Sequence, residues 1–218
     1  MTDPSRKGEP RWPTTLAVVF LIALPFLIPY RLGFGWTRWL FTAGEVVLVI
    51  ALTVADPGII DRTSDVTRGL AIALISVLAA TSLYATARLV YEIVQAAPAL
   101  QNATTLLVTG GLIWLDTVIT FSLLYWELDG GGPATRFLDP RPFPDLAYPQ
   151  HLNPGVCPPG WRPLYLDYVY LGVTNALAFS PTDVMPLARW AKVVMGLQSL
   201  VSVVILGLVI ANAVNILK

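Results

Sequence analysis

The sequence predicts an all-α polytopic membrane protein with about five transmembrane helices and a re-entrant half-helix and loop before the last helix. Of its 218 residues, 55% are hydrophobic and only 13% are charged, whereas ordinary soluble domains carry about 25% charged residues. Five stretches approach the ~20 mostly apolar residues that a helix needs to span a bilayer. Between the fourth and the fifth stretch lies a segment that is too polar and too often interrupted to span.

Turn signals separate the five apolar stretches. Asp-Pro-Gly at 56–58 ends the second, and a triple glycine at 130–132 follows the fourth. The short connection 96–102 predicts that the third and fourth form an antiparallel hairpin. The first stretch is short and contains two prolines, so it is the weakest of the five. The predicted spans are residues 14–30, 39–55, 69–95, 103–126 and 191–217.

The chain divides into three regions by composition. Residues 1–127 form the region of the first four spans. Residues 128–163 are rich in proline and glycine and predict an extramembrane loop. Residues 164–218 hold the interrupted segment, with its half-helix and filter-like strand, and the final helix. We expect these regions to form one small helical unit.

Composition also argues against several functions. With 14 basic and 14 acidic residues, the chain has no net charge and gives no reason to expect a nucleic-acid partner. The single cysteine cannot form an internal disulfide, and with one histidine it cannot build a zinc cluster. We find no nucleophile motif or phosphate loop, and we therefore expect neither an enzyme nor a cofactor.

Four ionisable residues fall inside the predicted spans, where charges are costly and usually face a bundle interior or water. Arg88 and Glu92 are four residues apart and can pair on one helix face. Asp116 could instead meet Arg88 across the hairpin. These groups could form an ion or proton relay or merely a structural salt bridge between helices, and the second interpretation is favoured. The four residues are Glu45, Arg88, Glu92 and Asp116.

The interrupted segment begins as a helix. Pro163 suits a first turn, and residues 164–173 offer about ten residues, or about 15 Å of helix, which is half a bilayer. We expect an extended return over residues 174–179 and a turn at the mouth of the loop. The turn consists of Ser180, Pro181, Thr182 and Asp183. A half-helix, an extended return and a full helix describe a re-entrant loop.

This order resembles the pore module of potassium channels and their relatives. The family's filter strand reads Thr-Thr-Val-Gly-Tyr-Gly-Asp and is followed by Pro-Leu-Gly-Arg. Here the matching positions are Thr174, Asn175, Ala176, Leu177, Ala178, Phe179 and Ser180, followed by Pro-Leu-Ala-Arg at 186–189. The resemblance covers about a quarter of the chain, from residue 165 to residue 217.

Both filter glycines are replaced, by Leu177 and Phe179. Glycine permits the positive φ angles that such a filter uses, and leucine and phenylalanine resist them. The segment is therefore more similar to uncharacterised bacterial integral membrane proteins that keep this layout without a glycine filter. The resemblance implies a protein of the bacterial inner membrane with an atypical filter at Thr174, Asn175 and Ala176.

The final helix carries a stripe with 4-3-4-3 spacing, which places its members on one face. A stripe that is polar at both ends and aliphatic in the middle is typical of a pore wall with a hydrophobic constriction. Alternatively, its polar members hydrogen-bond a neighbouring helix. The stripe consists of Gln198, Ser202, Ile205, Val209 and Asn212.

Three functions remain open. The first is an oligomeric pore in the lipid bilayer, a tetramer by resemblance, acting as a weakly selective channel for monovalent cations. The second is a non-conducting membrane scaffold that keeps the pore-module architecture. The third is a small membrane carrier or enzyme that uses the buried charges or the loop residues Asp139, Asp145 and His151.

Overall fold

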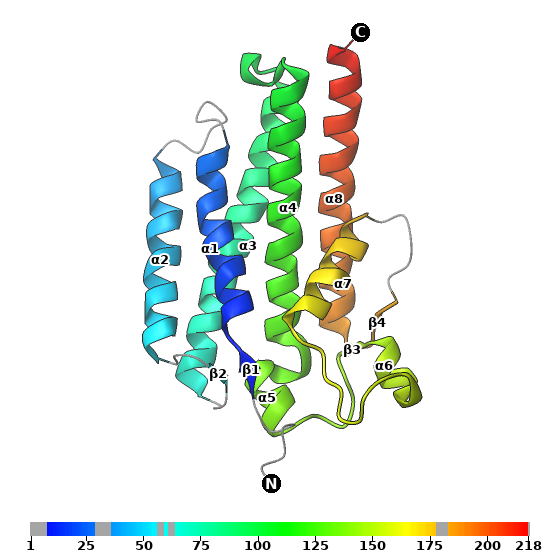
Figure 1. Ribbon diagram of the computed structural model, residues 1–218. Coiled ribbons are helices and arrows are strands. Elements are labelled where there is room, and N and C mark those ends of the chain that lie inside the picture. The colour runs from blue at the N-terminus through cyan, green and yellow to red at the C-terminus, as the bar shows by residue number, and fades with distance from the viewer. Residues whose placement is uncertain (1–7, 29–35, 56–58, 61–63, 178–182, 218) are drawn as a thin grey trace.

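The computed structural model describes residues 8–28, 36–55, 59–60, 64–177 and 183–217. In these residues the chain is a bundle of long helices that run along one axis, with short elements gathered at one end (Figure 1). The long helices are α1 (Trp12–Leu27), α2 (Thr37–Ala55), α3 (Asp65–Val94), α4 (Ala103–Leu128) and α8 (Arg189–Ile216).

The predicted helical class is confirmed. Four helices, α2, α3, α4 with its 3₁₀ extension, and α8, are long and apolar enough to cross a membrane by length and composition. Helix α1 is apolar but has 16 residues, fewer than the ~20 of a typical span. The last two residues of the predicted first span, 29 and 30, lie outside the described residues.

The predicted hairpin of the third and fourth spans is confirmed, since α3 and α4 pack against each other. A side chain caps each of these helices at its N-terminus. Ser64 Oγ accepts a hydrogen bond from the Thr67 amide, and Asn102 Oδ1 accepts one from the Thr105 amide. Such caps satisfy amides that have no partner within the helix. The connection between the helices contains the 3₁₀ turn η3 (Pro98–Leu100).

Short elements close the end of the bundle near the N-terminus (Figure 1). Strand β1 (Glu9–Pro10) pairs with β2 (Ile59–Ile60), and β3 (Leu146–Ala147) pairs with β4 (Met185–Pro186), both antiparallel. Between the end of α4 and residue 165 the chain forms four further short helical elements. They are η4 (Asp129–Gly131), α5 (Pro133–Leu138), α6 (Pro149–Leu152) and η5 (Pro154–Val156).

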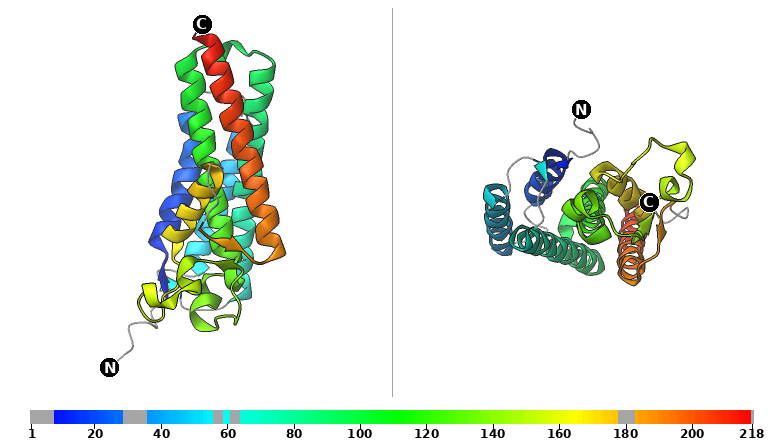
Figure 2. Two further views of the ribbon diagram at one scale, coloured as in Figure 1. Left: turned by 90° about the vertical axis from the view of Figure 1, so that its right-hand side faces the viewer. Right: turned by 90° about the horizontal axis from the view of Figure 1, so that it is seen from below.

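Helix α7 (Tyr165–Leu177) is the half-length helix. Its 13 residues span about 20 Å, and it packs against both α4 and α8. It rises from the end that holds β3 and β4 and stops part-way along α8 (Figures 1 and 2). Because β4 pairs with β3, the chain is back at its starting end before α8 begins.

One hydrophobic cluster joins residues from both ends of the sequence. It contains Leu21 of α1, Phe121 of α4, Leu171 of α7 and Met195 of α8. Regions 1–127 and 164–218 therefore share a core, and the chain forms one folded unit.

The contact between α7 and α4 depends on a glycine. A Cβ at Gly172 would overlap Ser122 Oγ and lie 3.0 Å from the Val118 carbonyl oxygen. We expect Gly172→Ala to lower the free energy of unfolding by about 1–3 kcal/mol, because the two helices must separate. This loss should lower the thermal midpoint in detergent by about 2–4 °C per kcal/mol.

The matched control is Gly196→Ala on α8, where a Cβ would meet open space. Alanine is the better helix former, so this variant should be neutral or slightly more stable. Equal midpoints for the two variants would contradict the close packing of α7 on α4.

Candidate functional site

The candidate site is built around α7, which turns one face into the bundle. Tyr168, Leu171, Gly172, Asn175 and Ala176 are buried, at helical spacing. The opposite face is exposed. At the start of the helix, Asp167 accepts a hydrogen bond from the Leu164 amide at 2.8 Å, which caps α7 and complements its dipole.

A hydrogen-bond network ties α7 to α4 and α8. Tyr125 of α4 donates to Gln198 Oε1 of α8 at 2.6 Å, and Asn175 Nδ2 of α7 donates to the same oxygen at 2.8 Å. Gln198 Nε2 in turn donates to the Gly172 carbonyl at 2.9 Å. Asn175 also donates to the Met195 carbonyl, and Ser199 donates back to Asn175. These buried polar groups satisfy one another, so the network fixes the depth and rotation of α7.

The predicted filter strand is wrong at its first four positions. Helix α7 continues to Leu177, so Thr174, Asn175, Ala176 and Leu177 are helical and form no extended return. The Thr174 hydroxyl donates back to the Tyr170 carbonyl, as in a helix, and the Asn175 side chain donates to the Met195 carbonyl of α8. The helical periodicity of the buried residues was the signal for this longer helix. Ala178 and Phe179 lie outside the described residues.

Most of the predicted turn at the mouth of the loop also lies outside the described residues, namely Ser180, Pro181 and Thr182. Asp183 is exposed, and its Oδ2 accepts a hydrogen bond from Tyr170 at 3.3 Å. This contact joins the chain after the loop to the outer face of α7.

The stripe on α8 does lie on one face, but that face points into the protein rather than toward a lumen. Gln198, Ser202, Ile205 and Val209 are buried. Val209 contacts Gly110 of α4, and Gln198 bonds Tyr125. The alternative of hydrogen bonding to a neighbouring helix is therefore correct for Gln198, and the pore-wall interpretation of these four residues is wrong.

Asn212, the last member of the stripe, is half-buried, and its side chain donates to the Leu208 carbonyl of its own helix. The outward face of α8 is instead aliphatic. Its exposed members include Val193, Leu200, Val203, Ile210 and Val214.

The charges inside the spans separate into two groups. Arg88 and Glu92 form the predicted i,i+4 pair on α3. Glu45 is the buried residue of the described helix α2, and it accepts a hydrogen bond from Thr81 of α3 at 3.0 Å. Asp116 of α4 lies near Ser82 of α3 and near Glu45, and its buried Oδ2 has no hydrogen-bond partner among the described residues.

The Thr81–Glu45 hydrogen bond therefore links α3 to α2, and a hydrogen bond of 3.4 Å between the Ser82 and Thr117 hydroxyls links α3 to α4. The Arg88 guanidinium pairs with the Glu92 carboxylate of the same helix. The alternative pairing of Arg88 with Asp116 across the hairpin is not the one formed.

Sequence reasoning missed a second buried polar cluster, at the end of the bundle. Arg136 of α5 donates to the carbonyl oxygens of Trp126 and Asp129 at 2.6 and 2.7 Å. Its guanidinium lies 5.0 Å from the ring centre of Tyr168, and Tyr168 donates to Asp129 Oδ2 at 2.6 Å. The cluster fastens the glycine turn after α4 to the first half of α7.

Glu9 of β1 completes this cluster. Its two oxygens accept hydrogen bonds from Trp126 Nε1 at 2.8 Å and from the Tyr165 amide at 2.6 Å, and Arg136 lies 4.0 Å away. Burial raises the pKa of Glu9, an effect opposed by these hydrogen bonds and by Arg136. The partners are over 100 residues apart in sequence, so no local pattern could have revealed them.

No family model matches the chain, and no curated protein or solved structure matches it either. Among the described residues, no group of three or more His, Cys, Asp or Glu side chains could hold a metal ion. The geometry of α4, α7 and α8 is thus the basis for assigning a function.

The network around Gln198 can be tested with two asparagine variants. Asn175→Leu leaves the Met195 carbonyl without its side-chain donor and should lower the free energy of unfolding by about 1–3 kcal/mol. Asn215→Leu changes an exposed asparagine near the end of α8 and should stay within about 0.5 kcal/mol of wild type. Thermal unfolding in detergent measures both, and equal midpoints would exclude a stabilising network.

The second cluster can be tested with two arginine variants. Arg136→Met leaves buried carboxylates without their cation and should cost about 3–5 kcal/mol. Arg141 is half-exposed and lies 3.6 Å from Asp145, so Arg141→Met should cost about 0–1 kcal/mol. A loss at Arg141 as large as that at Arg136 would contradict the role of the buried cluster.

Proposed function

We propose that the chain is a channel-like membrane protein in which α4, α7 and α8 form one subunit's share of an oligomeric pore. One observation carries the proposal. A half-length helix is held between two long apolar helices, and the chain returns to the end from which that helix started. In a membrane this is a re-entrant segment, and α1, α2 and α3 flank it as further helices of the subunit.

The electrostatics of α7 favour a cation. The carbonyl end of a helix carries about −0.5 elementary charge, and on α7 this end lies at Leu177, part-way along the bundle. Ordinary surface helices end in water, where this charge is screened. Inside a membrane the same charge acts across a short distance of low dielectric and attracts monovalent cations.

Oligomerisation follows from the geometry of one subunit. A single α7 and a single α8 cannot enclose an axis. The stripe of α8 that contains Gln198 is buried against the rest of the subunit, so it cannot line such an axis. The aliphatic outward face of α8 is then the surface left to line an axis, as a hydrophobic constriction. We propose four subunits, by resemblance to the potassium-channel pore module, and a location in the bacterial inner membrane.

Flux into liposomes tests the proposal. Purified protein in potassium-loaded vesicles should release the cation faster than empty vesicles do. Val203→Ser, on the outward face of α8, should raise this flux because a hydroxyl wets the constriction. Val54→Ser on the exposed face of α2 is the matched control and should leave the flux unchanged. Absence of flux from both wild type and Val203→Ser would contradict conduction.

A non-conducting scaffold is the second candidate, and the aliphatic outward face of α8 favours it. An axis lined by Val, Leu and Ile side chains can exclude water and ions altogether. Cysteine cross-linking distinguishes an oligomer, which both candidate functions require, from a monomeric protein. In a Cys157→Ser background, Val203→Cys should form disulfide-linked dimers and the buried Ser202→Cys should not. Cross-linking without flux would support the scaffold.

A further inference from the structure

Two acidic side chains lie near each other inside the bundle, Glu45 of α2 and Asp116 of α4. Both belong to helices that are long and apolar enough to cross a membrane. Glu45 is only 2% exposed, although the other residues of α2 are exposed or half-buried. Asp116 has a buried Oδ2 that finds no hydrogen-bond partner among the described residues. Both carboxyl groups therefore lie against other helices of the protein.

No basic side chain acts on either carboxyl within the part of the chain that the structure describes. On α2, the Arg38 guanidinium lies over the rings of Phe26 and Trp39. On α3, Arg88 pairs with Glu92. Helix α1 packs against both α2 and α4 and contains no ionisable residue. Two negative charges without a cation are costly in surroundings of low dielectric, so a bound proton would stabilise the pair.

The hydrogen bonds around Glu45 indicate a protonated carboxyl. The Thr81 hydroxyl lies 3.0 Å from Glu45 Oε1 and 3.0 Å from the Val77 carbonyl oxygen of its own helix. A hydroxyl carries one proton, so it can donate to only one of these two oxygens. If Glu45 is a carboxylic acid, its O–H donates to Thr81 and Thr81 donates to Val77. Both contacts are then hydrogen bonds, and the direction that an ionised Glu45 would impose is reversed.

Donors are equally few beside Asp116. The Thr117 hydroxyl donates to the Ile113 carbonyl at 3.0 Å and lies 3.4 Å from the Ser82 hydroxyl. Ser82 must then donate its one proton to Thr117, which leaves none for the neighbouring Asp116. A proton bound to the carboxyl pair would supply the missing donor.

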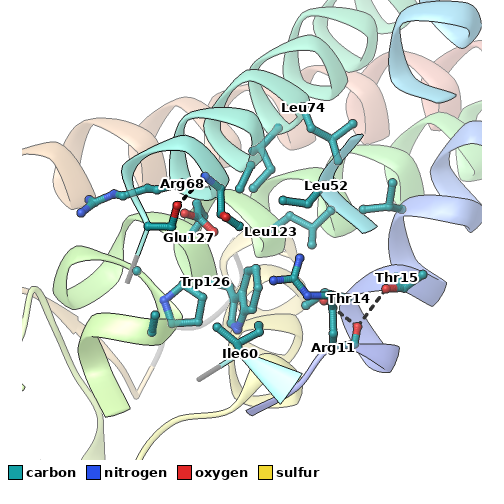
Figure 3. A pocket seen from close by; sticks show the side chains of 18 of the residues that line it. Arg11, Thr14, Thr15, Leu52, Ile60, Arg68, Leu74, Leu123, Trp126 and Glu127 are labelled. Carbon is teal, nitrogen blue, oxygen red and sulfur yellow. Dashed lines mark hydrogen bonds between the residues drawn. The ribbon is translucent and has the colours of Figure 1, made fainter. Parts of the chain in front are cut away.

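A pocket of about 250 Å³ enters the bundle from the end near the N-terminus. It lies between α1, α2, α3, the end of α4 and the start of α5 (Figure 3). Its inner wall is aliphatic and includes Leu52, Leu74 and Leu123. Its rim includes exposed polar residues such as Thr53, so the pocket is open to the outside.

The inner end of the pocket comes close to both carboxyls. Val49 lines the pocket and precedes the end of α2 by one turn less than Glu45 does, a rise of about 6 Å. On α4, the lining residue Leu123 is about 10 Å of rise from Asp116. Between them lies Thr120, one turn from Asp116 on the same helix face. Thr120 is 1% exposed and its hydroxyl has no partner among the described residues. A water molecule that reaches inward from the pocket would satisfy it.

We propose that Glu45 and Asp116 form a proton-binding site that exchanges its proton through this pocket. The proton comes from water in the pocket and forms an O–H bond with a carboxylate oxygen, which lowers the negative charge of the pair by one. The new O–H is the donor that Thr81 and Ser82 cannot provide. Two carboxyls that lie close together in surroundings of low dielectric share a proton because they cannot both ionise.

Infrared difference spectroscopy of the purified protein in lipid tests the site. A protonated carboxyl absorbs at a higher frequency than a carboxylate, and groups common to two samples cancel in the difference. At pH 7, the wild-type spectrum minus that of Glu45→Gln, or minus that of Asp116→Asn, should show a protonated-carboxyl band. Glu92→Gln is the matched control and should show none, because Glu92 pairs with Arg88. Each substitution keeps the size of the side chain, so the variants should fold.

Transfer of the protein to heavy water tests the route. The band should move to lower frequency as deuterium replaces the proton. Leu52→Trp narrows the pocket and should slow this exchange several-fold. Val54→Trp, on the exposed face of α2, is the matched control and should leave the exchange rate unchanged.

Three results would overturn the proposal. The first is the absence of the band from the difference spectrum of Glu45→Gln or of Asp116→Asn, because the two carboxyls would then share no proton. The second is loss of the band when sodium ions are added, which would make the occupant a monovalent metal cation. The third is equal exchange rates in wild type and Leu52→Trp. Since the band reports protonation and needs no conduction, these results are independent of the flux into liposomes.

Discussion

The Gln198 side-chain amide is the interaction on which the arrangement of this protein depends. Helix α7 is too short to span a bilayer, so its position must come from contacts with the full-length helices. Gln198 provides them by accepting hydrogen bonds from Tyr125 and Asn175 and donating to the Gly172 carbonyl. Gly172 allows α7 close enough to α4 for these bonds to form. In surroundings of low dielectric such bonds are strong and their loss is costly.

A second constraint holds the end of the bundle together. Glu9, Arg136 and Asp129 connect the N-terminal strand, the glycine turn after α4 and the first half of α7. The proline-rich region 128–163 is anchored by these buried polar groups and by Leu146 and Tyr148, which belong to the main hydrophobic cluster. The two constraints act at different depths, one at the start of α7 and the other near its end, and together they fix both its position and its tilt.

The sequence was informative where a pattern is local and repeated. Apolar length predicted the long helices, spacing predicted the Arg88–Glu92 pair, and periodicity placed the α8 stripe on one face. The sequence did not predict the role of polar residues whose hydrogen-bond partners are distant in the chain. Asn175 suggested a filter position, but its partners on α4 and α8 keep it helical. Glu9 gave no signal, since its partners lie more than 100 residues away.

The proposed pore requires that α7 is an inserted helix held inside the bundle to its last turn. Hydrogen–deuterium exchange of the backbone amides, in lipid nanodiscs, measures this directly. Amides 171–177 should exchange as slowly as those of the buried middle of α4, because Gln198 and Asn175 hold that turn in place. Rapid exchange over 171–177, as in a frayed or surface-lying segment, would contradict it.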